Sequence, residues 1–147
     1  MKTDDIDLAI IRRLWDGRIP FSKIAKEIGV TTNTVRARVN KLIENGILQI
    51  IGLVDPQAIP GHYSAIIGIK AEPRMVKQLL EKIGKLKGVV AAACVSGGFD
   101  IIAVVFFNEK YSHRDFIFDK LAKLDGLVSV ETFFTMDAVN WQLRYVL

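Results

Sequence analysis

Apolar positions follow a helical period over the first third of the chain. Between residues 5 and 45 they recur every three or four positions, which predicts three helices. These are Asp5–Trp15, Lys23–Ile28 and a third helix that begins at a threonine cap (Thr31 or Thr32) and runs to about residue 45, each followed by a glycine. On this pattern Trp15 is expected in the core.

The remainder of the chain alternates short β-branched runs with helical stretches. Residues 82–90 (KIGKLKGVV) reappear as residues 120–128 (KLAKLDGLV), and each copy is the end of an amphipathic helix, a glycine turn and the start of a strand. With strands Tyr63–Ala71 and Ile101–Phe107 and a second helix at about Ser112–Leu124, this predicts a ferredoxin-like βαββαβ plan, in which two helices cover one face of an antiparallel sheet. A last extended run, Ala138–Val146, is expected to add a strand. The uncovered face would be apolar, and we expect a second subunit to bury it.

The two patterns meet at a segment that continues neither of them. The run VDPQAIPG holds two of the four prolines and a glycine, which interrupt helices and central strands alike. We therefore expect a helical domain at residues 1–53, a linker at 54–61 and an α+β domain at 62–147. The predicted fold class is α+β, with a three-helix, winged-helix-like domain followed by the ferredoxin-like one.

Basic residues are concentrated in one short window. The whole chain has a net charge of +4, whereas the window from Arg18 to Lys41 holds six bases against one acid, Glu27, and is +5 by itself. Such a block indicates an anionic partner met by one face of the protein. The longest apolar runs are seven residues, and a membrane span needs about 20, so no membrane partner is expected. A lone cysteine, Cys94, excludes an internal disulfide and fits a reducing cytosol.

The basic window contains the spacing of a helix-turn-helix. In residues 24–35 (IAKEIGVTTNTV) a short helix, a glycine turn and a second helix follow one another. The second of these helices begins with small hydrogen-bonding side chains, which suit base edges in the major groove, while bases nearby suit phosphates. The alternative is an ordinary three-helix bundle with a solvated basic face. Arg38 could instead pair with an acid of the first helix. The candidate DNA-binding residues are Lys23, Thr31, Thr32, Asn33, Thr34, Arg36, Arg38, Asn40 and Lys41.

A glycine-rich turn is the second feature of interest. Residues 96–100 (SGGFD) lie between two expected strands, and by themselves favour a simple hairpin turn. Bare backbone N–H groups beside the Asp100 carboxylate would also suit a zwitterion. His62 and His113 show no metal-ligand spacing with Cys94, which is expected to be a small core residue. With no nucleophile beside a base, and no phosphate loop, neither an enzyme nor a cofactor is expected.

Taken together, these features resemble the Lrp/AsnC (feast/famine) family of prokaryotic transcription regulators over nearly the whole chain. The resemblance is carried by Asp4–Asp7 with Ile10–Ile11, Asp16–Ile19, the Ile24–Leu42 helix-turn-helix, Gly46–Ile47, Val54–Pro56, Gly97-x-x-Asp100 and Leu124-x-Gly126 before Thr132. It implies an N-terminal DNA-binding domain and a C-terminal ligand-sensing domain that forms homodimers, often joined into tetramers or octamers. It further implies a cytoplasmic, nucleoid-associated protein with an amino-acid site between dimers. The implied effector residues are Ser96, Gly97, Gly98, Phe99, Asp100, Thr132 and Thr135.

The sequence thus predicts a sequence-specific, homo-oligomeric regulator that binds double-stranded promoter DNA and responds to a small effector, an amino acid on the resemblance. One alternative is an architectural protein that compacts DNA with little sequence preference. The other is a ferredoxin-like enzyme or sensor whose helical domain binds protein.

Overall fold

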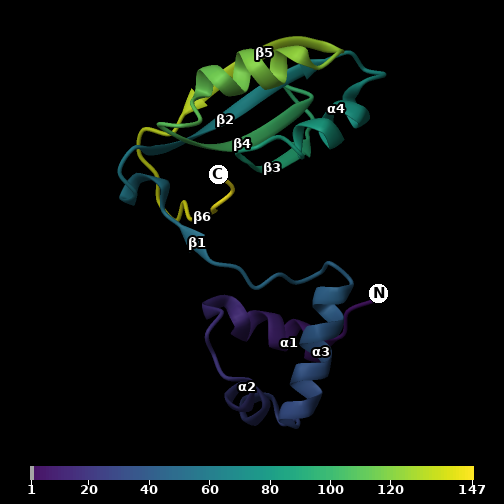
Figure 1. The fold of residues 1–147 in the computed structure, drawn as a ribbon. Helices are drawn as coiled ribbons and strands as arrows, with labels where there is room; N and C mark the ends of the chain where they lie inside the picture. The colour runs from purple at the N-terminus through teal and green to yellow at the C-terminus, as the bar shows by residue number, and fades with distance from the viewer. Residues whose placement is uncertain (1) are drawn as a thin grey trace. The chain divides into compact units, whose positions relative to one another are not determined.

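The computed structural model describes residues 2–147, which divide into two compact units (Figure 1). One unit ends at Ile51 and the other is Gly52–Leu147. No helix in the described part of the chain is both long and apolar enough to cross a bilayer. The first unit is helical and the second is built on a sheet, which confirms the predicted α+β class.

Three helices form the N-terminal unit: α1 (Asp5–Arg13), α2 (Phe21–Ile28) and α3 (Thr32–Glu44). Their core is small, and Ile10 of α1 and Ile24 of α2 are fully buried in it. The helix-turn-helix expectation is confirmed in outline. The second helix was expected to begin at Lys23. It begins two residues earlier, at Phe21, and Pro20 is its N-cap. No strand occurs in residues 2–51, so no wing accompanies the three helices.

The expectation for Trp15 was wrong. The first helix ends at Arg13 and continues as a 3-10 turn, Leu14–Asp16, which advances about 120° per residue rather than 100°. Leu14 therefore keeps the inward position, and Trp15 turns out of the apolar stripe. Its side chain is 90% exposed.

The C-terminal unit holds a four-stranded antiparallel sheet with strand order β3-β4-β2-β5 (Figure 1). Its strands are β2 (His62–Ala71), β3 (Val89–Cys94), β4 (Ile101–Asn108) and β5 (Leu127–Phe134). Helix α4 (Val76–Ile83) follows β2, and a second helical segment follows β4. The strand that follows each helix, β3 or β5, pairs with a strand of the other βαβ unit, β4 or β2. This is the strand order of the ferredoxin-like plan, which is therefore confirmed.

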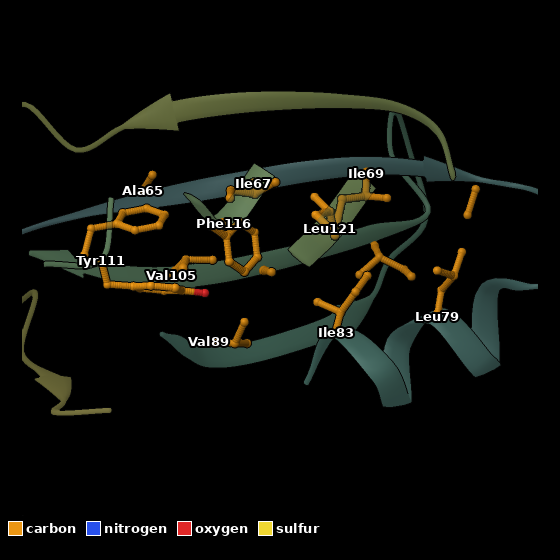
Figure 2. Close-up of a cluster of buried hydrophobic side chains, with 14 residues drawn as sticks. Ala65, Ile67, Ile69, Leu79, Ile83, Val89, Val105, Tyr111, Phe116 and Leu121 are labelled. Carbon is orange, nitrogen blue, oxygen red and sulfur yellow. The ribbon is translucent and has the colours of Figure 1, made fainter. Parts of the chain in front are cut away.

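The core of this unit lies between the sheet and its helices (Figure 2). Ile67 on β2 packs there with Leu79 and Ile83 of α4. The second helical segment is not the regular α-helix expected at Ser112–Leu124. It forms a π-type turn, Asp115–Lys120, and then a 3-10 turn. Phe116 and Leu121 are both fully buried, five residues apart, and a π-turn brings positions five apart to the same side.

A two-stranded sheet joins the start and end of the C-terminal unit. Strand β1 (Leu53–Val54) pairs antiparallel with β6 (Leu143–Arg144), and Pro56–Ala58 form a 3-10 turn capped by Asp55. The residues from Val54 onward, where a linker was expected, thus carry secondary structure in the second unit. The strand expected at 138–146 is reduced to Leu143–Arg144. Ahead of it, the Trp141 indole donates a 2.9 Å hydrogen bond to Ser64 Oγ.

Candidate nucleic-acid interface and effector turn

The turn between α2 and α3 has the geometry of a helix-turn-helix. Gly29 adopts φ +71°, the left-handed conformation that ends α2 and that larger side chains resist. The Val30 amide donates to the Ala25 carbonyl (3.0 Å), which closes the turn. Because Ala25 is small and buried, α3 approaches α2 closely. The outer side of α3 is therefore presented by a fixed pair of helices.

Three exposed side chains form one stripe along α3. Asn33, Arg36 and Asn40 are exposed, and their spacing of three and four residues puts them on one face. Lys41 and, on α2, Lys23 are exposed as well. None of the bases among these side chains makes an ion pair within residues 2–147. The stripe thus carries amide and guanidinium groups suited to base edges, with two lysines available to phosphates.

The two hydroxyls at the start of α3 are already engaged. Thr31 caps the helix, and its Oγ1 accepts from the Thr34 amide (3.1 Å) and lies 2.8 Å from Thr34 Oγ1. These threonines fix the helix start, while Thr32 is half-buried beside them. The structure therefore sorts the predicted residues into those that hold α3 and those that face outward.

Arg38, a candidate DNA contact, pairs with acids at the start of the first helix, which is the alternative that the sequence left open. Its Nη1 donates to both carboxylate oxygens of Asp4 (2.6 Å each) and to Asp7 Oδ1 (2.9 Å). The Arg38 guanidinium and the Asp7 amide hold the pKa of the Asp4 carboxyl below its usual value. In turn, the hydrogen bonds to the Asp4 and Asp7 carboxylates raise the pKa of Arg38. Since the Asp7 side chain is buried, this clamp ties the start of α1 to α3.

In the C-terminal unit, the turn at residues 96–100 is anchored to the end of β2. The Asp100 amide donates to the Ile69 carbonyl (3.0 Å), and Asp100 Oδ2 accepts from the Ala71 amide (2.9 Å). The Val95 amide donates to the Asp100 carbonyl (3.0 Å) and closes the loop. The amides of residues 96–99 donate no hydrogen bond to any of the described residues, and Ser96, Gly97 and Gly98 are exposed. A fixed carboxylate thus lies beside a row of available N–H groups.

Phe99 holds this turn against the sheet face that the helices leave uncovered, which we call the open face. A Cβ on Gly68 would lie 2.7 Å from the Phe99 ring, so the ring rests directly on the Gly68 backbone. The ring also makes an edge contact with Phe133, at 6.0 Å between centroids. Sequence reasoning missed Gly68 and Ala71. An isolated glycine inside a strand signals the close approach of another group, and that signal was present.

Thr132 and Thr135 do not join the turn within one chain. Thr132 pairs in register with the buried Ile67, and its Oγ1 lies 2.9 Å from His113 Nε2. Thr135 is bonded instead to Ser64 (3.2 Å), seven residues along β2 from the Ala71 anchor of Asp100. Seven residues of strand span about 23 Å. The expected effector residues thus lie in three separate places of one subunit.

His113 is the titratable group that sequence analysis gave no role. Burial lowers the pKa of its imidazole, and its ring packs 4.9 Å from that of Phe134. Cys94 is exposed, not in the core as expected, because it is the last residue of β3, an edge strand with a neighbouring strand on one side only. No three His, Cys, Asp or Glu side chains in the described residues are arranged to hold a metal ion.

Comparison with known proteins places both units in one family. An AsnC-type helix-turn-helix domain matches residues 4–43, and an Lrp/AsnC ligand binding domain matches residues 64–141. An uncharacterized HTH-type transcriptional regulator of Pyrococcus abyssi is 38% identical over 143 residues, which cover 96% of this chain and 90% of the relative.

Solved structures show the same fold at lower identity. AsnC of E. coli is similar with a TM-score of 0.71 and 23% identity, over 94% of this chain and 95% of the other. A transcriptional regulator of Neisseria meningitidis, solved as a complex with L-Met, has a TM-score of 0.72 at 18% identity, over 99% and 96%. The matched proteins are regulators rather than enzymes, and the chain described here belongs to the Lrp/AsnC family of helix-turn-helix transcriptional regulators.

Proposed function

We propose that this regulator reads a specific DNA sequence as a homo-oligomer and that an amino acid modulates its DNA binding or assembly. The polar stripe of Asn33, Arg36 and Asn40 on α3 is the observation that carries the proposal, because its side chains are exposed and its one base, Arg36, forms no ion pair within residues 2–147. Such a protein acts in the prokaryotic cytoplasm, on the nucleoid.

Arg36 is proposed as a base-reading residue, and Lys41 as a phosphate contact. A bidentate arginine–guanine pair contributes about 1–3 kcal/mol of discrimination between bases. Arg36→Ala should therefore lose most of the preference for the cognate duplex while keeping most non-specific affinity. Lys41→Ala is the matched control and should weaken binding to all duplexes alike. Fluorescence anisotropy with cognate and scrambled duplexes separates the two. An equal loss on both duplexes for Arg36→Ala would make it a phosphate contact.

The turn at residues 96–100 is proposed as the effector site. The exposed amides of Gly97 and Gly98 are placed to bind a carboxylate, and Asp100 Oδ1 makes no hydrogen bond within residues 2–147 and is left to accept from an ammonium group. The L-Met complex of the Neisseria neighbour supports an amino acid as the ligand class.

Asp100→Asn tests this site with the least disturbance of the turn. The amide oxygen of Asn can still accept from the Ala71 amide, whereas the charge that would pair with an ammonium is gone. Each common L-amino acid would be added in turn to the protein–DNA complex and the change in anisotropy recorded. We expect the variant to bind DNA normally and to lose the response. An unchanged response would leave the turn a purely structural hairpin.

Assembly is proposed to bury the open face of the sheet. Ile66, Val104 and Phe133 pair in register across three neighbouring strands on that face, and Phe133 is 49% exposed. A dimer formed there would carry two copies of α3 to half-sites about one helical turn apart or a multiple of that. An effector that binds one assembly better than another shifts the population of the form that binds DNA.

Phe133→Glu should reduce the mass measured by light scattering to that of a smaller assembly. Phe118→Glu is its control, since Phe118 is 65% exposed on the helix-covered side. Equal masses for Phe133→Glu and the unmodified protein would show that the open face is not the interface.

A further inference from the structure

Bases are unevenly divided between the two halves of the C-terminal unit. Residues 74–87, which include α4, carry five bases and one acid, whereas residues 109–125 in the second half carry four of each. No base in either segment forms an ion pair within residues 2–147. The excess gathers at the end of α4 and in the turn before β3, in three lysines: Lys82, Lys85 and Lys87. We call these three residues the lysine turn.

The lysine turn is held rigidly by the core beside it. The Tyr111 hydroxyl donates to the Lys87 carbonyl (2.9 Å), and Lys87 Nζ lies 5.0 Å from the centroid of the Tyr111 ring. Gly88, with φ +84°, leaves no room for a side chain, because a Cβ there would lie 2.8 Å from the Phe106 carbonyl oxygen. The backbone that carries the lysines is therefore preorganised, which lowers the entropic cost of binding a partner.

Helix electrostatics explain only part of this cluster. A base near a helix C-terminus interacts favourably with the helix dipole, but the effect falls off within the last turn. Lys82 lies in that turn, whereas Lys85 and Lys87 follow the last helical residue, Ile83, and both are exposed. The helix dipole thus accounts for neither Lys85 nor Lys87, and neither forms an ion pair within residues 2–147. Compact ammonium groups on flexible stems suit phosphates without fixing a sequence.

We propose that the lysine turn is a second, sequence-independent DNA contact, which takes phosphates of the duplex outside the stretch read by α3. This inference rests on the proposed DNA binding of the N-terminal unit. The partner is a duplex long enough to pass both units of the protein. The contact would extend the stretch of DNA that the protein covers and would add affinity, while sequence preference would still depend on α3.

The salt dependence of binding measures such contacts directly. Each phosphate contact contributes about −0.9 to the slope of log affinity against log salt concentration. The full-length triple variant Lys82→Gln, Lys85→Gln, Lys87→Gln would be compared with the unmodified protein on two duplexes. One holds only the site, about 20 bp, or two helical turns. The other carries the same site within flanks several turns long. Glutamine keeps the length of the side chains, and circular dichroism melts verify the fold.

The second half of the unit supplies a matched control. Arg114→Gln, Lys120→Gln and Lys123→Gln remove the same charge from the half that has no excess of bases. On the long duplex we expect the slope of the lysine-turn variant to be shallower by about 2–3 for each subunit whose lysine turn contacts the duplex, and that of the control variant to be unchanged. On the short duplex neither variant should differ from the unmodified protein.

Three results would overturn the inference. Equal slopes for the lysine-turn and control variants on the long duplex would mean that the lysine turn makes no phosphate contact of its own. An equal loss on both duplexes would place their effect in the site that α3 reads. If the unmodified protein bound neither duplex, the proposed function would fail and this inference with it, a result that differs from a failure confined to the variant.

Discussion

The two units are held together by different interactions. All three ion pairs found in residues 2–147 lie in the N-terminal unit, where Arg13 pairs with Glu27 and Arg38 with Asp4 and Asp7. That unit's core holds six buried apolar residues, against fourteen in the C-terminal unit. A domain of about 50 residues buries a smaller fraction of its surface than a larger one, so its stability is marginal. Arg13 and Arg38 are therefore used in clamps, while the α3 stripe, Lys23 and Lys41 remain available to DNA.

The C-terminal unit shows the opposite arrangement. Its large core and continuous sheet hold the fold without ion pairs within the described residues, so its charged groups and one sheet face remain available to partners. The comparison teaches that a charged residue has to be judged by the core around it. Arg13 and Arg38 are structural in the small domain, whereas no arginine or lysine of the well-packed unit forms an ion pair within residues 2–147.

The largest expected effect is on the core of the C-terminal unit. Phe116→Ala removes a fully buried ring and should lower the free energy of unfolding by about 3–5 kcal/mol. Each unit has one tryptophan, Trp15 in the N-terminal unit and Trp141 in the C-terminal one. Urea unfolding followed by tryptophan fluorescence therefore reports on the C-terminal unit in a Trp15→Phe background and on the N-terminal unit in a Trp141→Phe background. The loss should be confined to the Trp141 signal. Equal loss in the Trp15 signal would mean that the units unfold together.

The next effect tests the clamp of the N-terminal unit. Arg38→Met leaves the buried Asp7 carboxylate with the Asp4 amide as its donor, and an under-satisfied buried group costs about 1–3 kcal/mol. Arg36→Met, on the exposed stripe, should change stability by less than about 0.5 kcal/mol. Urea unfolding followed by Trp15 fluorescence measures both. If the two variants cost the same, the clamp does not stabilise the unit.

The smallest effect is a difference in pH dependence. The folded pKa of His113 lies below its ordinary 6.5 because of burial. The unfolded chain therefore takes up this proton first, and the contribution of neutral His113 to stability, complete above pH 6.5, is lost as pH falls through the folded pKa. The N-terminal unit has no histidine, and its Asp4 clamp is lost only as pH falls below 3.8.

Unfolding midpoints between pH 7.5 and 5, a range around the histidine pKa of about 6.5, test this difference. The Trp141 signal should shift to lower urea concentration on acidification, and the Trp15 signal should not. His113→Asn should flatten the Trp141 profile. A profile that stays steep in this variant would assign the titration to another group.

The sequence predicted most of the architecture because the relevant signals are local or periodic. The glycine turn and helical spacing around Gly29 indicated the helix-turn-helix, and the repeat at residues 82 and 120 indicated the sheet. What it left open or missed depends on distant contacts or on a change of helix type. It left two kinds of partner open for Arg38, which meets an acid 34 positions away in the chain. Trp15 leaves the core when the helix becomes a 3-10 turn.

The effector site was the least predictable part. Asp100 was identified as a candidate, but the amide of Ala71 that holds its carboxylate lies 29 positions away in the chain. Thr132 lies in β5 and Thr135 directly follows that strand, and nothing in the sequence indicated that the first faces the core and the second bonds to Ser64. Their alternation follows from the register of β5 on β2, which only the structure provides. The assignment of effector residues remains a prediction.

Sequence-specific DNA binding through α3 is the central claim, and one comparison tests it most directly. Fluorescence anisotropy would be measured with a duplex from the gene's own upstream region and with a scrambled duplex, across about 50–200 mM salt. The account predicts salt-dependent binding to both, with affinity for the upstream duplex higher by at least about tenfold, or about 1.4 kcal/mol. Equal affinity for the two duplexes at every salt concentration would contradict it.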